Sequence, residues 1–232
     1  MSIASPALCL AQFAAEASLP QLTELACALT GLYKFAASRS SSVLDAEPLT
    51  TCSEIAAVLA EYPAMYGARK ARAAAGLAID RLGSPYETIL YLLLCLPRSM
   101  GGFGLPKPMA NAMVAPADDE RRLVSQNRYY PDLLWPQARL IVEYDSDECH
   151  SSPDRAANDS RRRNDLEMMG YAVVVVTRPI LSDDRLFEKT VGQLRRVLGL
   201  SARRDTEAFR ARRRELRHDL LKAPAPISGY WR

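Results

Sequence analysis

The sequence predicts a mixed α/β fold in which a helical region precedes a mixed sheet flanked by helices. Residues up to about 96 repeat apolar side chains at the spacing of amphipathic helices. Two short apolar stretches then lie between residues 129 and 144, ahead of a charged helical segment, 154–169. A run of strand formers at 172–177 follows, and the order strand, helix, strand implies a right-handed crossover.

Length and composition are those of an ordinary globular protein. The 232 residues are enough for one domain of usual size and a smaller one. The hydrophobic fraction of 48% and the charged fraction of 25% are ordinary, and the net charge of +3 is too small to indicate a partner. Arginine is concentrated at 161–163 and at 203–217. Such runs are either solvated helix faces or surfaces that follow a nucleic-acid backbone.

Cysteine usage and hydropathy predict the compartment. The five cysteines show no paired spacing, which favours reduced thiols over a disulfide framework or a zinc site. The first residues lack the Lys or Arg of a signal peptide. The run from Ile89 to Leu96 is far shorter than the ~20 apolar residues of a membrane-spanning helix. We therefore expect a soluble, cytoplasmic chain without a membrane partner.

Residues 1–82 are expected to form an all-helical N-terminal region. Thr51 and Glu54 have the spacing of a capping box, and Gly31 is suited to a helix stop. The serine-rich stretch 34–48 between these helices predicts a loop.

The next segment contains one more helix and then irregular chain. Ser84-Pro85-Tyr86-Glu87 begins a helix that continues to Leu96. Residues 97–108 are rich in Gly and Pro, which predicts an irregular linker. A short strand is expected at 111–114 and a loop at 115–122.

The segment 154–177 combines a helix with a buried strand. Gly170 ends the helix, and one of its faces carries Asp159, Arg162 or Arg163, Leu166 and Met169 at three- and four-residue steps. Residues 172–176 show no polar alternation, which is typical of a central parallel strand that is buried on both faces.

Three acidic residues stand in the two short apolar stretches: Asp132 in the first, Glu143 and Asp145 in the second. Glu143 and Asp145 are two apart on a strand and therefore share a face. If residues 136–139 form a four-residue hairpin loop, Asp132 stands directly opposite Glu143 and projects to the same side. A three-residue loop would place Asp132 on the other face.

These acids are either solvated groups at strand ends or a metal-binding cluster. Asp is disfavoured inside strands, and apolar neighbours on both stretches indicate a buried setting. Buried carboxylates without a partner are costly, so a cation or a basic partner is needed. Hard oxygen ligands select Mg²⁺, Mn²⁺ or Ca²⁺. The cluster is the preferred interpretation.

A set of motifs in the second half of the chain is similar to one known family. The motifs are Asp132, Glu143-Tyr144-Asp145, His150 and Asp159-x-x-Arg162-x-x-x-Leu166-x-x-x-Gly170-Tyr171, with Ser84-Pro85-x-Glu87, Leu105-Pro106-x-Pro108 and Trp135 fitting the same pattern. In their order and spacing they resemble an uncharacterised bacterial domain family. That family is grouped with the very-short-patch-repair (Vsr-like) endonucleases of the PD-(D/E)xK restriction-endonuclease-like superfamily.

The resemblance divides the chain into three parts. Residues 83–200 would form a restriction-endonuclease-like domain, a mixed sheet flanked by helices. The helical region 1–82 would precede it, and a basic C-terminal helix and flexible tail, 201–232, would follow.

The resemblance also implies roles for the acids. In related nucleases the first-strand Asp and the second-strand acid hold a divalent metal, which assigns Mg²⁺ or Mn²⁺ to Asp132 and Glu143. Glu87 would be a further acid from the upstream helix. The lysine usual in the superfamily is replaced by Asp145, and Ser146 stands where the resembled family favours glycine. His150 or Arg162 could supply the missing cation. No credible zinc ligand set is present.

Each remaining candidate has a plain structural alternative. Glu87 forms a capping box with Ser84, which alone explains it. His150 is either a general base, phosphate contact or metal neighbour, or a loop histidine without a role. Asp159 is either an ion-pair partner on the helix face, or it orients the arginines at 161–163 on a DNA phosphate or orients His150.

The leading hypothesis is a Mg²⁺-dependent DNA endonuclease that hydrolyses a phosphodiester by activated water. Its catalytic set would be Asp132, Glu143, Asp145 and His150, with Arg161, Arg162 and Arg163 binding DNA. The alternative is a nuclease fold without catalysis that binds nucleic acid or protein. The chain could also serve as the effector part of a defence or toxin-like system, with a partner on the N-terminal helices.

Overall fold

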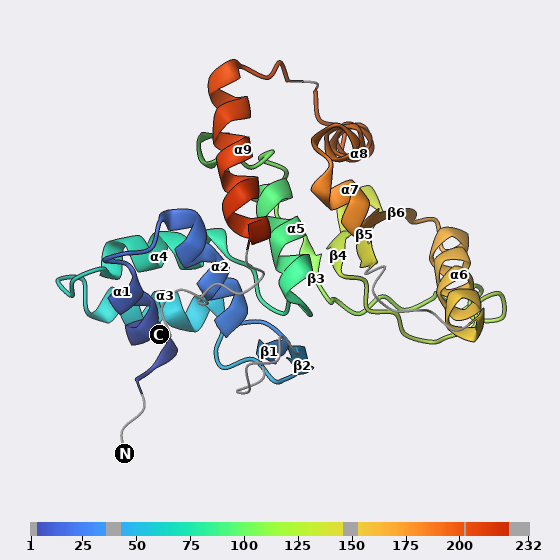
Figure 1. The fold of residues 1–232 in the computed structure, drawn as a ribbon. Helices are drawn as coiled ribbons and strands as arrows, with labels where there is room; N and C mark the ends of the chain where they lie inside the picture. Colours follow the sequence, from blue (N-terminus) through green and yellow to red (C-terminus); the bar gives the residue numbers. More distant parts are fainter. Residues whose placement is uncertain (1–3, 36–42, 146–152, 202, 223–232) are drawn as a thin grey trace. The chain divides into compact units, whose positions relative to one another are not determined.

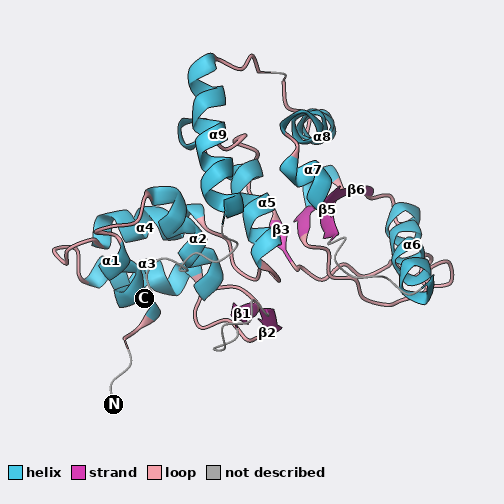
Figure 2. Cartoon of the chain, viewed as in Figure 1, coloured by secondary structure: helices cyan, strands magenta, loops and turns pink. Residues whose placement is uncertain are grey.

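The computed structural model describes residues 4–35, 43–145, 153–201 and 203–222. The chain forms two compact units, one of Met1–Pro106 with Asp205–Arg232 and the other of Lys107–Arg204. The second unit is thus inserted between two segments of the first. No helix among the described residues is long and apolar enough to cross a membrane. The general architecture is mixed α/β, with helices first and a mixed sheet later (Figures 1 and 2).

The first unit is mainly helical. Four of its helices begin at capping side chains, because Ser5, Ser18, Thr51 and Ser84 each accept a hydrogen bond from a backbone N–H of the first turn. The predicted box of Thr51 and Glu54 is present. The helices are α1 (Pro6–Phe13), α2 (Leu19–Leu29), α3 (Cys52–Glu61), α4 (Ala68–Leu77), α5 (Pro85–Cys95), the short 3-10 helix η1 (Arg98–Met100) and α9 (Glu207–Lys222).

The expectation that the N-terminal region is all-helical is wrong. Strands β1 (Tyr33–Phe35) and β2 (Val43–Asp45) pair antiparallel, β1 beginning one residue before the stretch 34–48 that predicted a loop and β2 lying within it. Tyr33 is buried, and its hydroxyl lies 3.1 Å from the Thr88 hydroxyl of α5. The serine-rich composition between the two strands predicts a loop and gives no sign of this contact between Tyr33 and Thr88.

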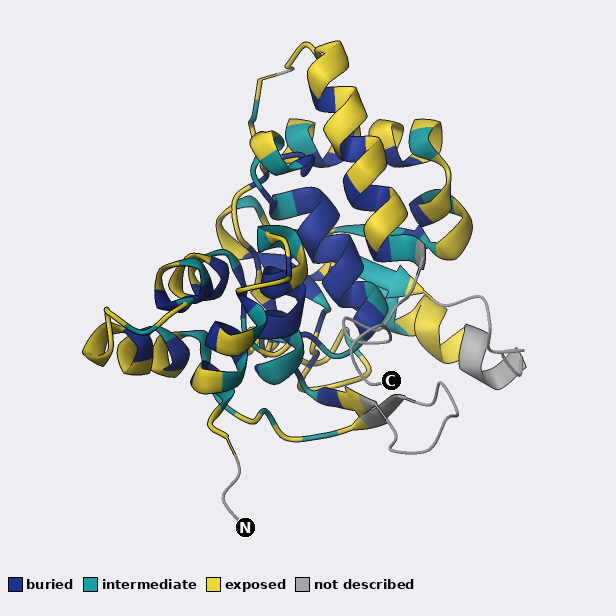
Figure 3. Ribbon diagram, turned by 60° about the vertical axis from the view of Figure 1, so that its left-hand side comes forward, coloured by how far each residue is buried: buried dark blue, intermediate teal, exposed yellow. Residues whose placement is uncertain are grey.

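The two chain segments that make up the first unit both pack against α5. This helix is buried along nearly its whole length (Figure 3), and it contacts both α2 and α9. The compact units consequently divide after Pro106 and Arg204, whereas domain boundaries were expected after residues 82 and 200. Gly101, at φ 95°, allows this packing, since a Cβ there would lie 2.5 Å from the Arg212 carbonyl oxygen of α9.

The second unit is built on a four-stranded mixed sheet in the order β3-β4-β5-β6. The β3–β4 and β4–β5 pairs are antiparallel, and β5 and β6 are parallel. A sheet of this mixed kind was predicted. Its elements are β3 (Met109–Ala110), β4 (Leu133–Trp135), the 3-10 helix η2 (Pro136–Ala138), β5 (Leu140–Asp145), α6 (Pro153–Met168), β6 (Ala172–Thr177), α7 (Arg178–Ser182) and α8 (Asp184–Val197).

The hairpin between β4 and β5 has the four-residue loop that would set Asp132 against Glu143. Trp135 pairs with Leu140, so that residues 136–139 form the loop, and Leu133 pairs with Val142. Arg139 closes the loop at φ 45°, a conformation that side chains rarely adopt.

Two strand predictions differ from the structure. Strand β6 is parallel to β5 as expected, but it is the edge of the sheet and most of its side chains are only half-buried. A run of valines satisfies strand propensity without requiring burial on both faces. The strand expected at 111–114 is instead β3, with a single bridge between Val114 and Tyr129.

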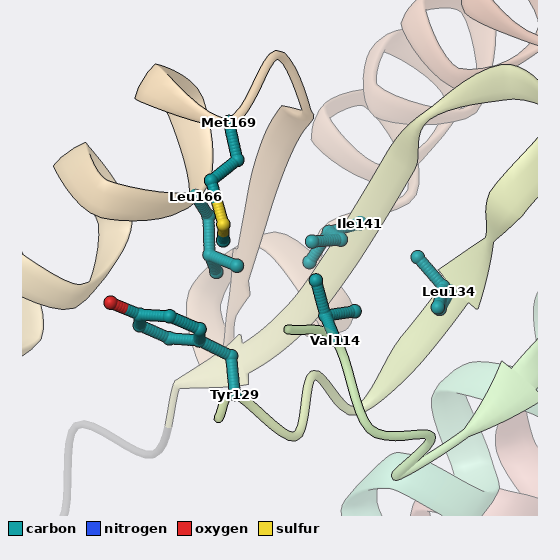
Figure 4. Packing of buried hydrophobic residues seen from close by; sticks show 6 residues of the cluster. All are labelled: Val114, Tyr129, Leu134, Ile141, Leu166 and Met169. Atoms are coloured by element: carbon teal, nitrogen blue, oxygen red, sulfur yellow. The ribbon is translucent and has the colours of Figure 1, made fainter. Parts of the chain in front are cut away.

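The core of the second unit lies between the sheet and α6. Leu166 of α6, and Met169 just beyond it, reach toward Ile141 of β5, as Figure 4 shows. Tyr129 and Val114 close the same cluster from the segment before β4, and Leu134 adds to it from β4. The predicted helix face of Leu166 and Met169 is therefore confirmed, and it fixes which residues of α6 meet the sheet.

Candidate functional site

Asp132 and Glu143 come together where β4 and β5 begin and end. The register that pairs Leu133 with Val142, continued by one residue, places Asp132 opposite Glu143. Both residues are half-buried. The Oδ2 atom of Asp132 accepts a hydrogen bond of 2.7 Å from the backbone N–H of Tyr144. This bond holds the Asp132 carboxylate against the backbone of β5.

Glu143 shares a face of β5 with Ile141, and this face is covered by α6. Arg162 of α6 meets Glu143 there. Its Nη1 atom lies 2.6 Å from both carboxylate oxygens, and its Nη2 atom donates to the Tyr130 carbonyl oxygen at 3.0 Å. The side chains are 27% and 17% exposed for Arg162 and Glu143. The structure thus pairs one of the arginines expected on DNA with one of the acids expected on metal.

Asp165, one turn further along α6, is a buried acid that was not predicted as part of the site. Its Oδ2 atom accepts hydrogen bonds from the Ser125 N–H at 3.0 Å, from the Ser125 hydroxyl, and from the Tyr129 hydroxyl at 2.8 Å. The Tyr129 oxygen in turn accepts from the Gln126 N–H at 3.0 Å. Every donor comes from the segment that leads into β4.

The electrostatics of Asp165 and Tyr129 follow from these contacts. Burial raises the pKa of Asp165, but the hydrogen bonds from Ser125 and Tyr129 and the charge of Arg161 outweigh burial and lower it. Burial raises the pKa of Tyr129, and its hydrogen bond to the Asp165 carboxylate raises it further. The tyrosine therefore remains a hydrogen-bond donor and Asp165 a charged acceptor.

A helical spacing could have revealed Asp165. Arg162, Asp165, Leu166 and Met169 recur at three- and four-residue steps, which place them on one face. The sequence interpretation put Asp159 on that face, but Asp159 is exposed. The position of Asp165 directly beside the apolar Leu166 indicates that this acid lies at the buried face of the helix.

The other residues predicted for the second unit differ in how far they are exposed. Asp145 ends β5 and is exposed. Arg161 is exposed and donates to the Asn158 side chain at 3.1 Å, while Arg163 is half-buried. His150 lies outside the residues that the structure describes.

Glu87 belongs to the first unit, where it has a capping role. Its N–H donates to the Ser84 hydroxyl at 3.1 Å, and its carboxylate accepts from the Gly83 N–H at 2.7 Å. These bonds tie down the start of α5. This geometry supports the interpretation of Glu87 as a helix-capping residue.

The arginines of the last helix fall into two classes. Arg213 is only 4% exposed and pairs with Asp205 at 3.4 Å, and Asp205 also pairs with Arg98 at 2.8 Å. The Arg98 guanidinium stacks 3.6 Å above the Phe209 ring. Arg217 is likewise buried, and an exposed pair, Arg210 and Arg214, contacts Glu207. Part of this basic run therefore stabilises the first unit.

The carboxylates of the second unit can be tested as metal ligands. Within the described part of the chain, no three His, Cys, Asp or Glu side chains are grouped to hold a metal ion. Mg²⁺, however, is commonly held by one or two carboxylates together with waters and substrate phosphates. Asp132 and Glu143 suit that mode by their chemistry and register, and in the chain alone Arg162 neutralises Glu143.

Comparison of the chain with protein-family models, with curated proteins and with solved structures gives no match.

Proposed function

We propose that the chain is a metal-dependent endonuclease that hydrolyses phosphodiester bonds in DNA. The observation that carries this proposal is the opposition of Asp132 and Glu143 across β4 and β5, with an arginine beside Glu143. Two carboxylates and a guanidinium at one half-buried point provide both ligands for a cation and a contact for phosphate.

The residues have distinct roles in this proposal. Asp132 and Glu143 would hold Mg²⁺ or Mn²⁺, which when bound polarises the phosphate and lowers the pKa of water. Arg162 supplies a cation at the site, where the wider superfamily usually has a lysine. The exposed Arg161 contributes to backbone affinity.

Plasmid cleavage tests the proposal. Purified protein is incubated with supercoiled plasmid and Mg²⁺ or Mn²⁺, and then with EDTA. Nicking by the wild type that is lost with EDTA and in both Asp132→Ala and Glu143→Gln is the expected result. Asp118→Ala is the matched control, because its side chain is 94% exposed. Equal nicking by all four proteins would assign the activity to a contaminant.

A second candidate function rests on the ion pair itself. In the chain alone both Glu143 oxygens are satisfied by Arg162, as expected for a nuclease fold that binds a partner without cleaving it. DNA binding by the wild type without metal-dependent cleavage of duplex, mismatched or single-stranded substrates would favour this binding module.

A further inference from the structure

One short segment, Ser125–Tyr130, holds two side chains of α6 that are one helical turn apart. Ser125 and Tyr129 donate hydrogen bonds to Asp165, and the Tyr130 carbonyl accepts one from Arg162. The two side chains have opposite charge and are held by opposite groups, donors for the acid and an acceptor for the base. A sideways or rotational shift of α6 would break both sets of bonds.

The same segment leads directly into the acid pair. Tyr130 is two residues before Asp132, and the isolated bridge between Tyr129 and Val114 ties the segment to the chain that follows β3. Tyr129 also packs in the hydrophobic core with Leu166 (Figure 4). The position of Arg162 is thereby defined relative to Asp132 as well as to Glu143.

Arg162 occupies the coordination space that a cation at Glu143 would use. Its Nη1 atom is 2.6 Å from both oxygens, so that one nitrogen lies between them. A divalent ion binding the same oxygens at ~2.0–2.6 Å would meet the guanidinium at short range, where like charges repel strongly. Ion and arginine therefore compete for Glu143.

We infer that Arg162 is an internal counter-ion of Glu143 which a divalent ion must displace, and that Asp165 is the positioning residue that holds it there. The inference rests on the proposed function for the identity of the ligand, a divalent cation. It adds a property of the chain itself: the metal affinity of the acid pair is set by how firmly α6 is bound to Ser125–Tyr130.

Calorimetric titration with Mn²⁺ alone tests the inference on the full chain. Arg162→Gln should bind Mn²⁺ about tenfold more tightly than the wild type, a size typical of coupled sites. Arg162→Lys keeps the charge and should remain close to the wild type. Asp165→Asn should give a smaller increase, because α6 remains packed while its charged anchor is lost. Asp132→Ala combined with Arg162→Gln should lose the tight binding, which locates the ion.

The outcomes distinguish the counter-ion role of Arg162 from the proposed endonuclease activity. Equal Mn²⁺ affinity of folded wild type and Arg162→Gln, both abolished by Asp132→Ala, overturns the counter-ion and leaves the endonuclease standing. Tighter binding by Arg162→Gln without plasmid nicking by the wild type supports the counter-ion and counts against the endonuclease. No Mn²⁺ binding by any folded variant overturns the counter-ion, and plasmid nicking then decides the endonuclease separately.

The role of Asp165 has its own control. Ser125→Ala removes one hydroxyl donor to Asp165 but leaves the backbone donor and Tyr129. This variant should therefore fold even if Asp165→Asn does not, and circular dichroism monitors the folding of both variants. If Ser125→Ala and Asp165→Asn, where folded, bind Mn²⁺ with the affinity of the wild type, Asp165 has no positioning role and the inference is restricted to Arg162.

Discussion

Arg162 and Glu143 form an ion pair between α6 and β5 in which one guanidinium nitrogen lies 2.6 Å from both carboxylate oxygens. The pair joins α6 to β5, an inner strand of the sheet. The Nη2 atom of the same guanidinium donates a hydrogen bond to the Tyr130 carbonyl oxygen.

The ion pair should be visible as a coupling energy. Arg162→Gln and Glu143→Gln should each lower the free energy of unfolding by about 1 kcal/mol, since both side chains are partly exposed and solvent screens them. The double variant should lose less than the sum. Urea denaturation of the four proteins without metal measures the coupling, and strict additivity would show that the pair contributes nothing to stability.

The exposed Arg161 should affect DNA affinity through its charge. Arg161→Ala should weaken DNA binding equally for different sequences and reduce the salt dependence by about one counterion. Fluorescence anisotropy of a labelled duplex at several salt concentrations measures both. Arg210→Ala is the matched control, because Arg210 is exposed and contacts Glu207 in the first unit. The same loss in both variants would indicate nonspecific charge effects.

Asp205 should stabilise the first unit much more than a surface acid does. Asp205→Asn removes ion pairs to Arg98 and to the buried Arg213, and should cost about 1–3 kcal/mol. Glu207→Gln also removes two arginine contacts, but these are exposed and should cost at most about 0.5 kcal/mol. Urea denaturation distinguishes the two, and similar values for both variants would contradict the structural role assigned to Asp205.

Glu24 should make the stability of the chain decrease with rising pH. This residue of α2 is only 7% exposed, and burial raises its pKa from 4.5 to about 8. The folded state therefore keeps a proton that the unfolded state releases above pH 4.5. Its contribution is full below that pH and is lost between pH 4.5 and 8, with a slope of about 1.4 kcal/mol per pH unit.

Replacing Glu24 by glutamine tests this linkage. Glu24→Gln should flatten the decline of the unfolding free energy between pH 5 and 8, as measured by denaturation at a series of pH values. Glu16→Gln, at an exposed position beyond α1, should leave the profile unchanged. A wild-type profile that rises over this range would show that other groups dominate.

Local patterns in the sequence determined much of this protein. For the loop before β5 the sequence left two lengths open, and the register of β4 and β5 selected the four-residue loop that opposes Asp132 to Glu143. Capping side chains such as Thr51 start helices, and the spacing of Leu166 and Met169 selects the face of α6 that meets the sheet. The caps and this helix face could be predicted because they depend on neighbours within a few residues and on the fixed periods of helix and strand.

Tertiary structure alone decided the contacts that give the acids and arginines their roles. Asp165 finds its donors about 40 residues away at Ser125, and Arg162 meets Glu143 from another element. Arg213 is buried although its helix is polar in sequence, because α9 packs against α5, which precedes the inserted second unit in the chain. Charge and polarity in a sequence do not reveal the partner, because burial of an ion depends on which distant chain segment supplies its counter-charge.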